Sequence, residues 1–223
     1  MKPYIQQKLK YTKDNRLIDE YGKSIMMDWE YPIMKKSAEV ICQNGGRVLN
    51  IGFGLGLIDS EIQKHPIDEH WIIEYHPDVY IKMLEDGWHL KKNAKILYGD
   101  WRFYLPYLPK FDGIYVDTWE EDLFQLHQYL PNILKKNGIY SFFNNINFNK
   151  TKDKIREEDW KFLKGHCEYE IETIEIPNVS SVDKQTTNNR YYWNPKNKTY
   201  YCPIIKLKKL YEKKKERQSS FND

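Results

Sequence analysis

One stretch of sequence decides the fold of this chain: Arg47-Val48-Leu49-Asn50-Ile51-Gly52-Phe53-Gly54-Leu55-Gly56. Its first half is short and β-rich, its second half has glycine at alternate positions, and residues 57–64 follow with helical character. A strand that passes through a glycine turn into a helix is typical of an open α/β sheet, where ligands bind beyond the carboxyl ends of the strands. The stretch therefore predicts a sheet and a ligand site at one edge of it.

Further strands and helices alternate along the chain. Four more short apolar runs predict strands, at 70–74, 95–98, 111–116 and 139–143. Helices are expected after Pro32 within 25–43, at 78–86, at 123–136 and around Trp160, Phe162 and Leu163. Two closing strands, at 168–176 and 200–207, read as an antiparallel pair. This alternation predicts an α/β fold, a seven-stranded, mostly parallel sheet with helices on both faces.

The 223 residues suffice for one domain of ordinary size. We predict an N-terminal extension at 1–24, the α/β domain at 25–207 and a charged C-terminal tail at 208–223. The first 20 or so residues are polar and are expected to be loosely held. The basic run in the tail fits a solvated helix end or contact with an acidic partner.

Composition argues against several classes of protein. Hydrophobic residues make up 40% and charged residues 30%, so a packed core is expected. The net charge of +3 is too small to indicate nucleic-acid binding by itself. Cys42, Cys167 and Cys202 lie far apart, so neither a disulfide framework nor a metal site is expected. We see no membrane span and no secretory signal, and therefore expect a cytoplasmic location, with a nuclear one as the alternative.

The spacing of the glycines indicates which class of ligand the turn binds. A dinucleotide site would place its third glycine at position 57, which is Leu57, whereas here it is Gly56. This denser spacing resembles the S-adenosylmethionine turn of class I (Rossmann-like) methyltransferases. Gly52, Gly54 and Gly56 are then expected to let the backbone approach that cofactor closely. A plain connection between a strand and a helix is the alternative.

Acidic residues follow the next two strands. Glu74 ends the second strand, 22 residues after Gly52, where an acid accepts hydrogen bonds from ribose hydroxyls in such folds. Asp100 follows the third strand, where an acid or its neighbours commonly meet the adenine amino group, and Trp101 could cover the ring. The alternatives are a solvated Glu74 and simple core packing of Trp101.

Several segments together resemble one family. They are Val48 to Gly56, His70 to Glu74, Met26-Met27-Asp28-Trp29-Glu30-Tyr31-Pro32-Ile33-Met34, Val116-Asp117-Thr118 and Ser141-Phe142-Phe143-Asn144. This set is similar to guanidinoacetate N-methyltransferase and to its relative, the fungal type IV protein arginine methyltransferase, which methylates the internal δ-nitrogen of arginine. The likeness runs from about Asp19 to Leu207.

The resemblance assigns Glu30 and Asp117 to a carboxylate pair that holds a guanidinium and helps to remove its proton. A guanidinium stays protonated to a pKa above ~12 and is then a poor nucleophile, so carboxylates that match its planar fork suit the reaction. Asp117 also ends a central strand, where a ligand would lie. The alternatives are an N-cap for Asp117 and a capping arrangement ahead of Pro32 for Glu30.

The resemblance also implies substrate contacts. In the guanidinoacetate enzyme, the loop after the fifth strand binds the substrate carboxylate, and here Asn144 and Asn145 stand where that family has leucine and threonine. Trp29 is a candidate wall of the same pocket. The departure in the loop argues against guanidinoacetate as the substrate.

These observations predict an enzyme that uses S-adenosylmethionine to methylate a guanidino nitrogen, favouring the δ-nitrogen of arginine, in protein or free. The alternatives are methylation of guanidinoacetate, methylation of nucleic acid, and an inactive module that only binds S-adenosylmethionine. The nucleic-acid alternative lacks the Asn/Asp-Pro-Pro-aromatic signature of many base methyltransferases; the nearest segment is Asp117-Thr118-Trp119. The expected partner is an arginine-containing protein or a small guanidino compound.

Overall fold

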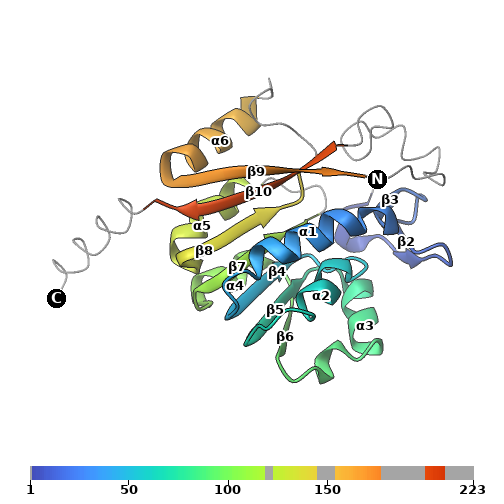
Figure 1. Cartoon of the computed structure of the whole chain (residues 1–223). Helices are drawn as coiled ribbons and strands as arrows, with labels where there is room; N and C mark the ends of the chain where they lie inside the picture. Colours follow the sequence, from blue (N-terminus) through green and yellow to red (C-terminus); the bar gives the residue numbers. More distant parts are fainter. Residues whose placement is uncertain (1, 119–122, 145–153, 177–198, 209–223) are drawn as a thin grey trace.

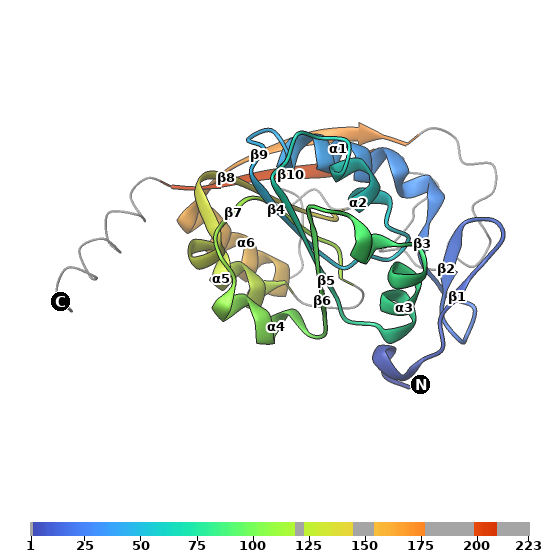
Figure 2. The ribbon, with the colours of Figure 1, turned by 90° about the horizontal axis from the view of Figure 1, so that it is seen from below.

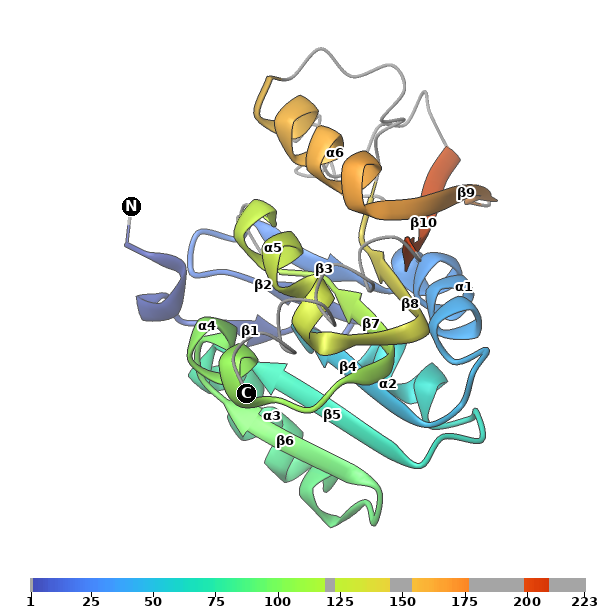
Figure 3. The ribbon, with the colours of Figure 1, turned by 90° about the vertical axis from the view of Figure 1, so that its left-hand side faces the viewer.

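A seven-stranded sheet forms the centre of the computed structural model, which describes residues 2–118, 123–144, 154–176 and 199–208. The strand order is β6-β5-β4-β7-β8-β10-β9, and Figure 3 shows the strands in this order across the molecule. Their bounds are β4 Arg47–Ile51, β5 Glu69–Glu74, β6 Ala94–Tyr98, β7 Phe111–Val116, β8 Leu134–Phe142, β9 Cys167–Glu175 and β10 Thr199–Leu207. The predicted α/β sheet is therefore confirmed.

The direction of the strands places a switch point beside β4. The strands β6, β5, β4, β7 and β8 are parallel, and β10 is antiparallel to both β8 and β9. The chain leaves β4 towards β5 and β6 on one side, then returns to build β7 and β8 on the other. Connections therefore diverge between the carboxyl ends of β4 and β7, which is where an open α/β sheet binds its ligand.

Helices cover both faces of the sheet (Figures 1 and 2). Their bounds are α1 Tyr31–Ile41, α2 Leu57–Ile62, α3 Pro77–Glu85, α4 Trp101–Tyr104, α5 Phe124–Ile133 and α6 Lys154–His166. Buried side chains of α1, α2 and α3 belong to one hydrophobic cluster, and those of α4, α5 and α6 belong to a second one. The strand β4 contributes to both, since Val48 joins the first cluster and Leu49 the second, as the alternation of a strand requires.

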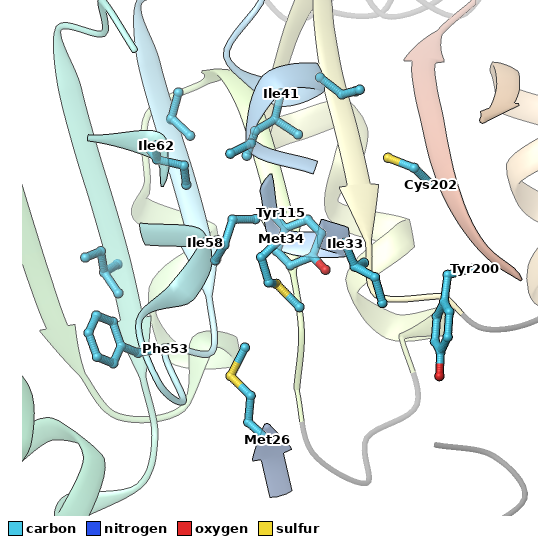
Figure 4. Packing of buried hydrophobic residues seen from close by; sticks show 14 of the residues in the cluster. Met26, Ile33, Met34, Ile41, Phe53, Ile58, Ile62, Tyr115, Tyr200 and Cys202 are labelled. Carbon is cyan, nitrogen blue, oxygen red and sulfur yellow. The ribbon is translucent and has the colours of Figure 1, made fainter. Parts of the chain in front are cut away.

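The first cluster fixes α1 against the sheet. Pro32 lies in the first turn of α1, where a missing N–H costs nothing. Ile33, Met34 and Ile41 of this helix are fully or almost fully buried and lie around Tyr115 of β7 (Figure 4). This packing holds the segment just before α1, residues 28–30, near the end of β7.

One predicted helix is too long. The pattern at 123–136 predicted a helix to Lys136, but α5 ends at Ile133 and β8 begins at Leu134. Leu134 pairs with Phe111 of β7 and is fully buried, so pairing with the sheet overrides the helical spacing. Asn137 then turns the chain with a φ of 64° before the predicted strand at 139–143.

The N-terminal residues are not loosely held, contrary to the expectation from their polarity. Three antiparallel strands, β1 Lys10–Tyr11, β2 Arg16–Ile18 and β3 Ser24–Met27, form a second small sheet. Leu17 is fully buried in the same cluster as α1, because alternate residues of β2 face the core. The division into an extension and a domain stays a prediction, and residues 209–223 of the predicted tail lie outside the described residues.

We expect Leu17→Ala to lower the free energy of unfolding by about 2–4 kcal/mol, the usual cost of truncating a fully buried leucine. Chemical denaturation monitored by circular dichroism would measure it. Leu90→Ala is the matched control, since Leu90 is 76% exposed and should lose little. Equal stability of the wild type and Leu17→Ala would contradict the packing of the N-terminal strands.

Candidate active site

A cavity of about 320 Å³ opens at the carboxyl ends of β4, β5, β6 and β7. It lies at the predicted edge of the sheet. The lining residues are Pro3, Tyr4, Ile5, Ile25, Met26, Ile51, Gly52, Phe53, Gly54, Ile58, Ile73, Glu74, Tyr75, Gly99, Asp100, Trp101, Asp117 and Thr118. The charged residues among them are the acids Glu74, Asp100 and Asp117, so the cavity suits a cationic ligand rather than a polyphosphate.

The glycine turn forms the floor of this cavity. Gly52, Gly54 and Gly56 all have positive φ, of 94°, 56° and 67°. A Cβ at Gly52 would lie 2.1 Å from the carbonyl oxygen of Asp117, and a Cβ at Gly54 would lie 2.6 Å from the Sδ of Met26. Gly52 and Gly54 therefore permit two close approaches, to the end of β7 and to β3.

Glu74 ends β5 inside the cavity and is 4% exposed. Its Oε2 accepts a hydrogen bond from the backbone N–H of Phe53 at 2.8 Å, and its Oε1 accepts one from the N–H of His76 at 2.6 Å. Burial raises the pKa of Glu74, and these backbone hydrogen bonds oppose that shift. The solvated alternative is excluded, since the carboxylate is buried and tied to the glycine turn.

Asp100 and Trp101 lie together at the start of α4. Asp100 caps this helix, because its Oδ1 accepts the backbone N–H of Arg102 at 2.9 Å and pairs with the Arg102 guanidinium at 3.0 Å. Trp101 is 3% exposed and lies under the same guanidinium, 4.4 Å from it. Trp101 thus packs in the core, as the alternative proposed, and lines the cavity as well.

Asp117 follows β7 and lines the cavity. Its N–H continues the sheet by donating to the carbonyl of Ile51 at 3.0 Å. Surrounding protein desolvates the side chain and raises the pKa of Asp117 to about 7. Asp117 does not cap α5, because Leu123 occupies that position. A carboxyl that titrates near neutral pH in a cavity is a candidate for proton transfer.

Glu30 does not line the cavity. It is 2% exposed, and its Oε1 accepts the N–H of Met27 at 2.7 Å, so one oxygen has the capping role of the alternative reading. Its charge nevertheless acts on the same neighbour as that of Asp117. Burial, followed by the charges of Asp117 and Glu30 among other causes, raises the pKa of Tyr115.

The other residues predicted to bind the substrate are Trp29, Asn144 and Asn145. Trp29 is buried outside the cavity lining, with its ring 5.5 Å from that of Tyr200. Asn144 is 5% exposed, and its carbonyl accepts the N–H of Tyr201 at 3.2 Å, which ties the loop after β8 to β10. Asn145 lies outside the described residues.

Sequence reasoning missed one wall of the cavity. Pro3, Tyr4 and Ile5 line it from the N-terminal 3₁₀ turn Tyr4–Gln6, and Met26 lines it from β3. The pKa of Tyr4 is raised by burial and by the charges of Glu74 and Asp117, among other groups. An aromatic residue in a polar stretch is the only local signal, and it is too common to identify a site.

The described residues hold no group of three or more His, Cys, Asp or Glu side chains that could bind a metal ion. None of the helices in the described ranges has the length and apolar composition that crossing a membrane requires.

Comparison with known proteins identifies the family to which the sequence is similar. The family description of guanidinoacetate N-methyltransferase matches residues 2–162. Protein arginine N-methyltransferase 2 of Candida glabrata is 36% identical over 212 residues, which cover 86% of this chain and 52% of that protein. The Saccharomyces cerevisiae protein of the same name is 34% identical over 213 residues, with the same coverage. The chain thus spans about half the length of these curated relatives.

Solved structures share the fold at low sequence identity. Spermidine synthase from Thermotoga maritima has a TM-score of 0.62 at 17% identity, covering 93% of this chain and 71% of that one. Fibrillarin of Aeropyrum pernix, solved with natively bound S-adenosyl-L-methionine, has a TM-score of 0.56 at 14% identity, covering 92% and 84%. The predicted class I methyltransferase fold is confirmed.

Gly52→Ala should lower the free energy of unfolding by about 2–5 kcal/mol, because alanine is strained at a φ of 94° and its Cβ would overlap the Asp117 carbonyl. Gly165→Ala is the matched control: this glycine of α6 has nothing within 4 Å of an added Cβ. Thermal unfolding of both variants would measure the difference. Similar midpoints for the two would contradict the close approach of β4 and β7.

Proposed function

Because the chain belongs to the guanidinoacetate N-methyltransferase family, we propose that it transfers the methyl group of S-adenosylmethionine to a guanidino nitrogen. The observation that carries this proposal is the position of Asp117, a carboxyl with a pKa of about 7, in a cavity whose floor is the glycine turn. The acceptor proposed first is arginine.

The cavity fits S-adenosylmethionine in shape and charge. Gly52 and Gly54 line it with backbone, packed closely against Asp117 and Met26, and the buried side chain of Glu74 is suited to accept ribose hydroxyls. Trp101 and Asp100 are suited to contact the adenine. The acidic lining favours a sulfonium cation. When bound, this cofactor supplies an electrophilic methyl group.

Asp117 and Glu30 are proposed to act on the acceptor. A guanidinium must be held planar and must lose a proton as its nitrogen is methylated, and a carboxylate pair performs both tasks. Asp117, as the carboxylate, accepts the proton or orients the nitrogen that carries it. Glu30, which is buried, adds the second negative charge from the segment that precedes α1.

The δ-nitrogen of arginine, in a protein or free, is the acceptor we favour. The curated relatives cited above carry the name protein arginine N-methyltransferase, and the substituted loop at Asn144 and Asn145 argues against the small carboxylate substrate. Guanidinoacetate is the second candidate, since it gives the family its name. Labelled S-adenosylmethionine offered with arginine-containing proteins, arginine and guanidinoacetate would separate them, and hydrolysis would identify the methylated nitrogen.

Glu30→Gln and Asp117→Asn should each reduce turnover by roughly 10²-fold or more, because they keep the shape and remove the charge that accepts a proton. Affinity for S-adenosylmethionine should stay within a few-fold. The two losses should not multiply in the double variant, since both residues act on one cation. Near-normal methyl transfer by both single variants would exclude the guanidino chemistry while leaving the cofactor assignment intact.

The pH dependence should report Asp117. Its pKa is raised to about 7, so the carboxylate form increases as the pH rises through 7. We expect kcat/KM to climb about tenfold per pH unit below 7 and to level off above it. Asp117→Asn should remove this limb from the residual rate. A wild-type kcat/KM that stays constant between about pH 5.5 and about pH 8 would argue against Asp117 as the proton acceptor, because a single titrating base must change its protonation over that range.

A further inference from the structure

The N-terminal wall of the cavity is too short to hold itself in place. Pro3, Tyr4 and Ile5 line the cavity, but the 3₁₀ turn they open contains three residues, Tyr4–Gln6, closed by the bond from the Gln7 N–H to the Tyr4 carbonyl at 3.0 Å. A single turn is not stable alone in water. Its position over the cavity must therefore come from contacts with the rest of the protein.

His76 makes the central contact. Its ring is fully buried, its Nε2 lies 3.2 Å from the carbonyl oxygens of both Tyr4 and Gln7, and its ring centroid is 4.9 Å from that of Tyr4. On its other side, Nδ1 accepts the backbone N–H of Asp78 at 3.1 Å and so caps α3. Because Nδ1 accepts, the proton is on Nε2, which donates to the turn.

His76 also connects this turn to Glu74, the acid that is predicted to bind the ribose hydroxyls. The backbone N–H of His76 donates to Glu74, so the residue that orients the carboxylate also holds the opposite wall of the cavity. Burial lowers the pKa of His76, against the opposing charge of Asp78, while Asp78 itself pairs with Lys8 at 2.7 Å.

We propose that His76 is a positioning residue that holds the Tyr4 turn over the cavity, so that part of the affinity for S-adenosylmethionine depends on its Nε2–H. The inference rests on the proposed function, which supplies the ligand. His76 belongs neither to the glycine turn nor to the carboxylate pair, and its role is to complete the binding surface by holding a distant part of the chain.

Two substitutions separate the two sides of the ring. Asparagine at position 76 places an oxygen near the position of Nδ1, so His76→Asn keeps the cap of α3 but cannot reach the turn. Glutamine places its amide near Nε2, so His76→Gln can still donate to Tyr4 and Gln7 but caps the helix poorly. A purely structural histidine would make ligand affinity follow thermal stability in both variants.

The expected results are opposite for the two variants. Calorimetry should show about tenfold weaker binding of S-adenosylmethionine to His76→Asn, the cost of the lost hydrogen bonds, with a near-normal melting temperature. His76→Gln should melt earlier and bind within a few-fold of the wild type. His89→Asn, at an exposed histidine, is the control for the substitution itself. Full affinity in His76→Asn, or affinity that follows the melting temperature in both variants, would overturn the proposal.

A second measurement needs no ligand. Hydrogen exchange of the backbone amides in residues 4–9 should accelerate in His76→Asn and stay near the wild-type rate in His76→Gln. Unchanged exchange in His76→Asn would also overturn the proposal. If the wild type itself does not bind S-adenosylmethionine, the proposed cofactor is wrong, and the exchange data still decide whether His76 holds the turn.

Discussion

The close approach of β4 and β7 at Gly52 is the constraint on which the site depends. The Asp117 carbonyl lies where a side chain at position 52 would begin, so the two strands can meet only because that residue is glycine. This approach places Asp117 beside the glycine turn. The turn, which connects β4 to α2, then lines the cavity. Beneath the turn, Asn50 donates to both carboxylate oxygens of Asp59, at 3.0 and 2.9 Å, and Asp59 lies 3.0 Å from His70. This buried polar group joins β4, α2 and β5 and holds the turn in one conformation.

Electrostatics give the cavity its chemical character. Burial raises the pKa of both Glu74 and Asp117, but backbone N–H groups that donate to Glu74 oppose the shift there, whereas burial acts alone at Asp117. The first arrangement suits a residue that accepts hydrogen bonds from hydroxyl groups. The second suits a residue that gains and loses a proton near neutral pH. Two acids in one cavity can therefore take different roles in the proposed reaction.

The N-terminal segment belongs to the same cavity, although its composition suggested a loosely held extension. Tyr11 donates to the carbonyl of Gly54 at 3.0 Å, and the N–H of Leu9 donates to Asp78 at 2.9 Å. With His76, these contacts connect residues 4–11 to the glycine turn and to the start of α3. A segment that contacts both the glycine turn and the start of α3 is thereby held where Tyr4 lines the cavity.

Local chemistry allowed the sequence by itself to determine the α/β fold, the strand, glycine turn and helix at 47–62, and the acids at the ends of β5, β6 and β7, while the class I type was indicated by resemblance. Periodicity, turn residues and strand ends are properties of neighbouring residues, so they can be read from the chain. Only the tertiary structure decided that β8 begins at Leu134, that Glu30 is absent from the lining of the cavity, and that Tyr4 forms part of that lining. These outcomes depend on contacts between residues far apart in the chain, such as the 72 positions from Tyr4 to His76, and local propensity carries no information about which distant partners the folded chain brings together.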